Sequence, residues 1–208
     1  DPKKLEVVDD KMEALIEENR LTGGTVVIAR KGKVAHFETY GLRNREEKLP
    51  VEKDTIFRIY SMTKAITSAA ALMLWEEEKL DLDDPLSKFF PPLKKMKVWK
   101  DGNLVDMERE ATVADLLRHT SGLTYGWMSN KAIREALRSA GVLDRDKKLV
   151  PMMNGMGEVP LQFQPGSDWV YGCSTDVLGG VVEVASGMPF DKFLEERIFK
   201  PLKMKDTG

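Results

Sequence analysis

The sequence of 208 residues has only one cysteine, Cys173, and only two histidines, His36 and His119. A single cysteine cannot form a disulfide within the chain, and these three residues are too few for a structural zinc site of the usual spacing. A metal cofactor is therefore not expected, and no organic cofactor is expected either. The scarcity of cysteine also favours a cytoplasmic protein, although the chain begins at Asp1 and a signal peptide removed upstream would fit equally well.

An excess of charge of one sign and long apolar runs are also missing. Lys and Arg number 32 against 34 Asp and Glu, and no segment carries the excess of positive charge that binding to nucleic acid requires. No stretch approaches the roughly 18–20 consecutive apolar residues of a membrane helix. We therefore expect neither a nucleic acid nor a membrane as partner. Hydrophobic residues make up 42% of the chain, which is enough for a folded core.

Hydrophobic spacing predicts both helices and strands in the first third of the chain. Residues 7–16 carry apolar side chains at helical spacing among charges. Residues 25–29 and 34–40 are rich in β-branched and aromatic side chains, and Gly32 between them predicts an antiparallel hairpin. A helix predicted from Ser61 to about Trp75 has no polar face, so we expect it to be buried.

Prolines divide the rest of the chain into shorter pieces. Residues of about 80–165 are predicted to be helical and loop structure. In the last segment, Ser174 is expected to be an N-cap and Gly187 a helix stop. The helices predicted beyond residue 80 are 113–118, 131–141, 175–185 and 190–199.

Ser61 and Lys64 are three residues apart at the start of the predicted buried helix, so their side chains share one face. A serine nucleophile needs a nearby base, and a lysine desolvated by an apolar helix can accept a proton near neutral pH. The alternative is an N-capping serine followed by a surface lysine. The Ser-x-x-Lys spacing alone does not decide between these two interpretations.

Three further residues lie where chemistry is possible. Tyr171 follows a Pro-Gly turn and precedes a helix, so that its phenol could reach a site or its ring could simply pack. His119 is next but one to Ser121, but the segment is more typical of a helix C-terminus closed by Gly122. Cys173 has no cationic neighbour in sequence, which favours a small buried side chain over a reactive thiol.

Four motifs occur in the order in which the serine β-lactamase-like superfamily has them, and together they cover nearly the whole chain. The sequence most closely resembles the class C-like branch, including the family VIII carboxylesterases, and Ser-x-x-Lys is a known motif of related penicillin-interacting enzymes. The matching segments are Phe57–Lys64, Leu80–Leu86, Leu116–Leu123, and Pro165–Tyr171 with Asp176–Gly179.

The resemblance implies an acyl-transfer site. Ser61 would attack a carbonyl carbon, Lys64 would assist its deprotonation, and Tyr171 would pass the proton to the leaving group. The backbone N–H of Ser61 would contribute to the oxyanion hole. In this family the segment from Arg118 to Gly122 has a structural role.

The implied fold is α+β, with an antiparallel sheet flanked by helices and a mostly helical region. It would make residues 1–208 a single domain, with residues 1–60 and about 166–208 as the α/β part and about 61–165 as the helical part. Family members run well past residue 208, so the C-terminal strands are expected to be missing from this chain. They would come from the same polypeptide or from a complementing chain, together with a second oxyanion-hole donor.

The sequence departs from the family pattern in two places. Penicillin-interacting members commonly have Tyr-x-Asn, in which the asparagine amide binds substrate, whereas Cys173 occupies the third position here. A thiol donates only weak hydrogen bonds, so a substrate-binding Cys173 would favour esters over lactams. In addition, the family's third motif, Lys-Thr-Gly or a Trp- or His-containing equivalent, does not occur.

These features predict a serine hydrolase that cleaves small carboxylic esters through an acyl-enzyme on Ser61. A β-lactamase or D-amino acid peptidase is the alternative within the superfamily. The alternative from another class is a non-catalytic protein that uses the scaffold for binding or assembly. The joint presence of Ser61, Lys64 and Tyr171 favours an enzyme.

Overall fold

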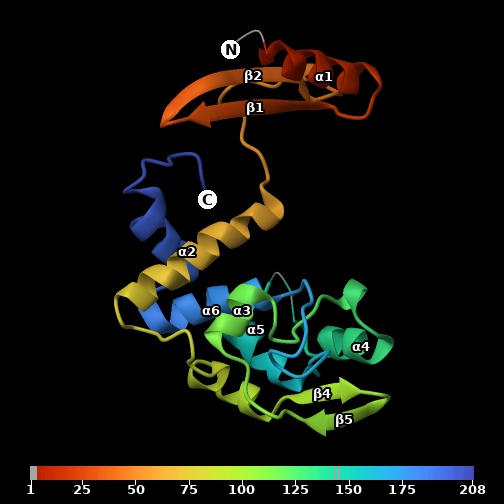
Figure 1. Cartoon of the computed structure of the whole chain (residues 1–208), viewed down its shortest axis with the longest axis vertical. Helices are drawn as coiled ribbons and strands as arrows, with labels where there is room; N and C mark the ends of the chain where they lie inside the picture. The colour runs from red at the N-terminus through yellow and green to blue at the C-terminus, as the bar shows by residue number, and fades with distance from the viewer. Residues whose placement is uncertain (1–3, 143, 145) are drawn as a thin grey trace. The chain divides into compact units, whose positions relative to one another are not determined.

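The structure, a computed structural model, describes residues 4–142, 144 and 146–208. The chain divides into two compact units, Asp1–Arg58 and Ile59–Gly208 (Figure 1). All side chains of the proposed catalytic set belong to the second unit. The first unit contributes a helix and a small antiparallel sheet.

In the first unit, β1 (Gly23–Arg30) pairs with β2 (Lys33–Asn44), and β2 pairs with the short β3 (Leu49–Pro50). Both pairings are antiparallel, with Val27 opposite Phe37 in the β1–β2 ladder. Lys31 and Gly32 both have positive φ at the tip, which is the backbone of the tight turns that match strand twist. The predicted hairpin is confirmed.

Helix α1 (Glu6–Glu17) packs on this sheet and is also confirmed (Figure 1). The Tyr40 hydroxyl donates a short hydrogen bond to the Asp9 carboxylate, and the His36 Nε2 lies 3.1 Å from the same hydroxyl. Burial and the Asp9 hydrogen bond raise the pKa of Tyr40 to about 12. This polar contact fixes α1 to β2, because both partners lose solvent when the helix docks.

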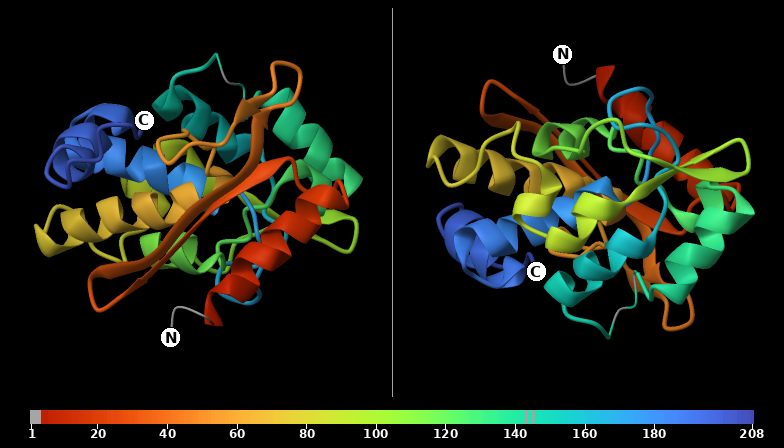
Figure 2. Two further views of the ribbon diagram at one scale, coloured as in Figure 1. Left: turned by 90° about the horizontal axis from the view of Figure 1, so that it is seen from above. Right: turned by 90° about the horizontal axis from the view of Figure 1, so that it is seen from below.

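The second unit is built around α6 (Ser174–Ser186), which contacts four other helices (Figure 2). Gly180 allows a close approach, because a side chain at this position would overlap Met153 and Phe90. The helices packed on α6 are α2 (Thr63–Glu76), α3 (Val113–Arg118), α5 (Leu149–Gly155) and α7 (Phe190–Leu194). The remaining helical elements are α4 (Lys131–Ser139), the 3-10 turns η2 (Tyr60–Met62), η3 (Leu86–Lys88), η4 (Pro91–Lys95), η5 (Gly126–Met128) and η6 (Met156–Glu158), and the π-helix η7 (Glu195–Phe199).

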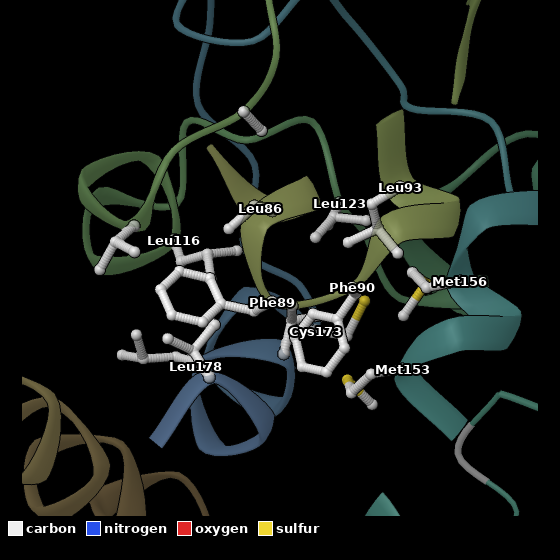
Figure 3. Close-up of a cluster of buried hydrophobic side chains, with 14 of the residues drawn as sticks. Leu86, Phe89, Phe90, Leu93, Leu116, Leu123, Met153, Met156, Cys173 and Leu178 are labelled. Carbon is white, nitrogen blue, oxygen red and sulfur yellow. The ribbon is translucent and has the colours of Figure 1, made fainter. Parts of the chain in front are cut away.

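A continuous hydrophobic core fills the space between these helices (Figure 3). Phe90 and Met153 are fully buried against α6, and Leu178 of α6 is fully buried with them. Fully burying side chains of this size stabilises the fold by roughly 1.5–3 kcal/mol each. The core therefore fixes α6, whose N-terminus lies next to Tyr171.

Three of the four helices predicted beyond residue 80 are found within one or two residues, but other details differ. The region of about 80–165, expected to be helical and loop, also contains a hairpin of β4 (Lys97–Lys100) and β5 (Asn103–Asp106). Its Asp101-Gly102 turn has positive φ at both residues, and strands of only four residues give little hydrophobic signal. The last predicted helix, 190–199, is α-helical only to Leu194 and continues as a π-helix.

Helix α2 begins at Thr63, two residues after the expected start at Ser61, because Tyr60–Met62 form the 3-10 turn η2, and it is not buried all round. It packs against α6 through one face, which holds Thr67, Ala70, Ala71 and Leu74. Leu72 and Trp75 remain 39% and 44% exposed. Contacts with α6 and α7 leave these two side chains uncovered, so an apolar composition does not by itself bury a helix.

Candidate active site

The structure brings Ser61, Lys64 and Tyr171 together. The Tyr171 hydroxyl donates a hydrogen bond of 2.6 Å to the Ser61 Oγ, and the Lys64 Nζ donates to the same oxygen at 3.4 Å. The Lys64 ammonium also lies 4.8 Å from the centre of the Tyr171 ring. One hydroxyl oxygen is thus contacted by two groups that can exchange protons with it, which is the geometry an activated serine needs.

The local chain path presents Ser61 at the start of a helix. Tyr60, immediately before it, has a φ of 45°, a left-handed conformation that costs a non-glycine residue roughly 1–2 kcal/mol. This turn leads the chain into η2 and then directly into α2, so that Lys64 follows one helical turn after Ser61. Ser61 is exposed and Lys64 is half-buried. Lys64 is therefore less desolvated than the apolar sequence of α2 predicted.

Tyr171 is held by backbone contacts on both sides. Upstream, the Val170 N–H donates to the His119 carbonyl at 3.1 Å. Downstream, Gly172 lies so close to the 123–124 backbone that a Cβ would overlap the Leu123 carbonyl and lie 2.5 Å from the Thr124 Cα. Only glycine permits this approach. These contacts place the Tyr171 phenol opposite the start of α2.

Hydrogen bonds with Lys64 and Ser61 lower the pKa of Tyr171. The positive charge of Lys64 acts in the same direction, whereas partial burial and the charge of Asp176 oppose it. A phenol with a lowered pKa loses its proton more readily, and the resulting phenolate can accept one. Tyr171 can therefore serve as a proton acceptor as well as a donor.

Two residues of this site were missed by the sequence analysis, Tyr125 and Asp176. The Tyr125 hydroxyl donates a hydrogen bond of 3.0 Å to Asp176 Oδ2, and the Tyr125 ring packs edge-on to Tyr171 with centroids 5.9 Å apart. The Lys64 Nζ lies 5.9 Å from the Tyr125 ring centre. Burial, followed by the charge of Asp176, raises the pKa of Tyr125. A usable signal was present, because Asp176 is an acidic residue at the start of an otherwise largely apolar helix.

His119 is nearer to the site than expected. It is the left-handed C-cap of α3, with a φ of 58°, and its ring lies 5.1 Å from that of Tyr171. Burial and then the charge of Lys64 lower the pKa of His119, which favours the neutral imidazole. The predicted helix end is confirmed, although His119 itself closes it. His119 contacts Tyr171 ring to ring, which fits packing against the phenol.

Cys173 does not meet the expectation that it binds substrate. Its side chain is fully buried in the core, and its thiol donates to the Thr124 carbonyl at 3.4 Å. Burial raises the pKa of this thiol to about 12. The start of α6 turns the third residue of the Tyr-x-Cys segment away from Ser61. The structure instead supports the alternative of a small buried side chain.

Ser174 is not an N-cap, contrary to expectation. It is the first residue of α6, and its hydroxyl lies 3.0 Å from the Ser121 hydroxyl. Both side chains are completely buried. This pair joins the start of α6 to the segment after α3, and so links Tyr171 to the 118–122 turn.

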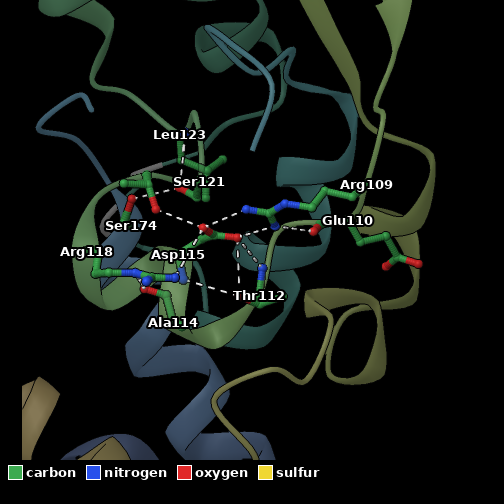
Figure 4. A network of polar contacts seen from close by, with 10 residues as sticks. Arg109, Glu110, Thr112, Ala114, Asp115, Arg118, Ser121, Leu123 and Ser174 are labelled. Atoms are coloured by element: carbon green, nitrogen blue, oxygen red, sulfur yellow. Dashed lines mark hydrogen bonds and ion pairs between the residues drawn. The ribbon is translucent and has the colours of Figure 1, made fainter. Parts of the chain in front are cut away.

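The buried carboxylate of Asp115 organises this turn (Figure 4). It accepts hydrogen bonds from the Arg109 guanidinium at 2.6 and 3.0 Å and from the Thr120 hydroxyl at 2.8 Å. Burial acts to raise the pKa of Asp115, but the hydrogen bonds from Arg109, Thr112 and Thr120 outweigh it and hold the pKa below its usual value. The segment Arg118–Gly122 is thereby fixed next to Tyr171, as a structural element.

The described residues include no group of three or more His, Cys, Asp or Glu side chains arranged to hold a metal ion. Across the same residues, no helix combines the length and apolar character needed to cross a membrane.

Comparison with known proteins shows the family to which the chain belongs. Residues 8–208 match the Beta-lactamase family. Esterase EstB of Burkholderia gladioli is 35% identical over 204 residues, covering 97% of this chain and 50% of that protein. Lovastatin esterase of Penicillium rubens is 31% identical, covering 96% of this chain and 52% of that protein. The chain thus spans about half the length of these curated relatives.

Solved structures agree with this match. EstCE1, described as a hydrolase with promiscuous acyltransferase activity, superimposes with a TM-score of 0.85 at 28% identity, covering 97% of this chain and 52% of that one. An unliganded simvastatin synthase from Aspergillus terreus gives a TM-score of 0.77 at 26% identity, covering 98% and 53%. Sequence and structure both show that the chain belongs to the β-lactamase family, with the α+β fold of that family.

Proposed function

We propose that this chain carries the nucleophile and proton-transfer residues of a serine hydrolase that cleaves small carboxylic esters. The observation that carries the proposal is the shared contact of Ser61 Oγ with the Tyr171 hydroxyl at 2.6 Å and the Lys64 ammonium at 3.4 Å. The similarity of the chain to proteins named as esterases supports an ester substrate over other acyl compounds.

Before the proposed first step, the Tyr171 phenol gives its proton to solvent water, and the resulting phenolate then accepts the proton of the Ser61 hydroxyl. The Lys64 ammonium, over the Tyr171 ring, stabilises the phenolate. The Ser61 oxygen then attacks the ester carbonyl carbon, and the carbonyl π electrons move to oxygen. The resulting oxyanion is bound by the backbone N–H of Ser61.

In the second step, the tetrahedral intermediate collapses and the bond to the alcohol oxygen breaks. Tyr171 returns its proton to the departing alkoxide, so the alcohol leaves neutral and an acyl-Ser61 ester remains. In the second half-reaction water attacks the acyl-Ser61 ester with the same proton transfers through Tyr171, and the carboxylic acid is released. An alcohol in place of water would give acyl transfer, the activity that the description of EstCE1 names beside hydrolysis.

A second oxyanion donor is proposed to lie outside residues 1–208, in the same polypeptide or in a complementing chain. One oxyanion-hole donor is typically worth 10²–10³ in rate.

The alternatives within the superfamily are a β-lactamase and a D-amino acid peptidase. Cys173 offers no amide-like group to such substrates because its side chain lies in the core. A non-catalytic protein would not need the 2.6 Å contact between Ser61 and Tyr171.

Initial rates on a short-chain aryl ester and on a chromogenic cephalosporin test the proposal, measured side by side. The assay uses the longest polypeptide that contains residues 1–208, and Ser61→Ala is the matched control. We expect ester turnover that depends on Ser61 and exceeds cephalosporin turnover. Faster cephalosporin hydrolysis would favour the β-lactamase, and Ser61-independent rates would overturn the proposal.

A further inference from the structure

Asp176 is an acidic residue placed among the proton-transfer groups of the site. It lies in the first turn of α6, is half-buried, and is held by the 3.0 Å hydrogen bond from the Tyr125 hydroxyl. No step of the proposed reaction uses it. A half-buried carboxylate at such a position exerts a stronger field than one at the surface, because water screens it less.

The titratable groups around Asp176 come from four parts of the second unit. Burial acts to raise the pKa of Asp176, and although the Tyr125 hydrogen bond and the Lys64 charge oppose this, the pKa stays above its usual value. The groups that interact with it are Lys64 on α2, His119 at the end of α3, Tyr125 after α3, and Tyr171 and Cys173 before α6.

We propose that Asp176 is a positioning residue that sets the pH at which this site becomes active, by stabilising the doubly protonated form of the Lys64–Tyr171 pair. The inference rests on the proposed function, in which the pair must lose one proton before Ser61 can attack. Tyr125 fixes the carboxylate through its hydroxyl, and the same ring lies edge-on to Tyr171 and 5.9 Å from the Lys64 ammonium.

The direction of the effect follows from charge. A negative carboxylate attracts the Lys64 ammonium and repels a phenolate at Tyr171, so both interactions disfavour loss of the proton. Asp176 thereby opposes Lys64 and Ser61, whose hydrogen bonds lower the pKa of Tyr171. Removing the charge should let the pair deprotonate at lower pH. Removing only the Tyr125 hydroxyl leaves the charge in place and should not lower the pH at which the pair deprotonates.

The variant Asp176→Asn tests this directly, since an asparagine oxygen can still accept from Tyr125 while the charge is lost. Tyr171 is observed by NMR with tyrosine labelled with ¹³C at Cζ, and Tyr171→Phe assigns the resonance. This titration needs no turnover, so it is independent of the proposed activity. We expect the Tyr171 midpoint in Asp176→Asn to fall by about 0.5–1 pH unit, and the acidic limb of the pH profile of kcat/KM for an aryl ester to fall with it.

Two controls separate charge from structure. Glu135→Gln removes a carboxylate from the exposed surface of α4, where Glu135 is 58% exposed, and should leave the midpoint unchanged. Tyr125→Phe keeps the Asp176 charge, so the titration midpoint of Tyr171 in this variant should not fall. An Asp176→Asn variant that folds, as judged by circular dichroism, with an unmoved Tyr171 midpoint would overturn the inference and leave the proposed function standing. A wild-type protein without Ser61-dependent turnover would overturn both.

Discussion

The hydroxyl oxygens of Ser61 and Tyr171 lie 2.6 Å apart although 110 residues separate them along the chain. The contact depends on α6, since Tyr171 precedes this helix and α6 packs against α2, whose first turn follows Ser61. Packing of α2 on α6 thus determines the distance between the proposed nucleophile and its proton acceptor.

Ser61→Ala should abolish ester turnover without destabilising the protein. The hydroxyl would form the covalent intermediate, whereas Ser61 is exposed and contributes little to the core. We expect kcat to fall by at least about 10³-fold and the free energy of unfolding to change by less than about 0.5 kcal/mol. Steady-state kinetics and urea denaturation measure the two quantities. A variant with wild-type acylation would show that Ser61 is not the nucleophile.

Tyr171→Phe and Lys64→Ala should each lower kcat by about 10²–10⁴-fold. The two groups act on the same proton, so the double variant should lose much less than the product of the two single losses. A double-variant cycle on kcat tests this. If Lys64→Ala costs less than about tenfold, Tyr171 acts as base without the ammonium.

Cys173→Asn should destabilise the protein and should not improve lactam turnover. An asparagine amide in place of a completely buried thiol would lose hydrogen bonds to water, at a cost of about 1–3 kcal/mol. Urea denaturation and the ratio of cephalosporin to ester turnover are the measurements.

The native Cys173 thiol should react with a disulfide reagent only after unfolding, because burial raises its pKa to about 12. Fast reaction in the folded state would contradict the buried placement.

Asp115→Asn should cost about 1–3 kcal/mol of unfolding free energy at neutral pH. In the folded chain the pKa of Asp115 is lowered, while an unfolded aspartate titrates near 3.9. The stabilisation from this carboxylate is therefore complete well above about pH 4 and is lost as the pH falls through the folded value. Urea midpoints of wild type and variant, measured from about pH 7 to about pH 3, should converge in acid. A constant difference would show that charge plays no part.

Gly172→Ala should disturb the site through the backbone. The added Cβ would overlap the Leu123 carbonyl, so the loop that carries Tyr171 must move. We expect a loss of stability of about 1–3 kcal/mol together with lower kcat. Gly126→Ala is the matched control, because its Cβ would make only an ordinary contact of 3.4 Å with Arg134. Equal effects in the two variants would rule out the steric explanation.

Much of this architecture could be predicted from local sequence patterns. The Gly32 hairpin and the helix after Ser61 each follow from spacing and turn residues within about fifteen positions. The Ser61–Lys64 spacing and the position of Tyr171 between a Pro-Gly turn and a helix made these residues candidates, but their catalytic roles were predicted from the resemblance to the β-lactamase-like superfamily. The hairpin β4–β5 was missed because its signal is confined to one Asp-Gly turn.

The remaining features depend on contacts between distant segments. Asp176 joins the site only because Tyr125, 51 residues earlier, donates to it. The resemblance assigned Cys173 to substrate, because it occupies the asparagine position of the family's Tyr-x-Asn motif, but the beginning of α6 directs its side chain into the core. Local patterns do not encode which way a side chain faces at a loop–helix junction, since packing against the rest of the unit decides it.

The most direct test of the account is the covalent step at Ser61. The polypeptide is treated with an aryl phosphonate that resembles the tetrahedral intermediate, and intact mass with peptide mapping locates the adduct. We expect a single adduct on the peptide that contains Ser61, absent from Ser61→Ala and formed much more slowly in Tyr171→Phe. An actively esterolytic protein whose adduct maps to another residue, or forms equally fast in Ser61→Ala, would contradict it.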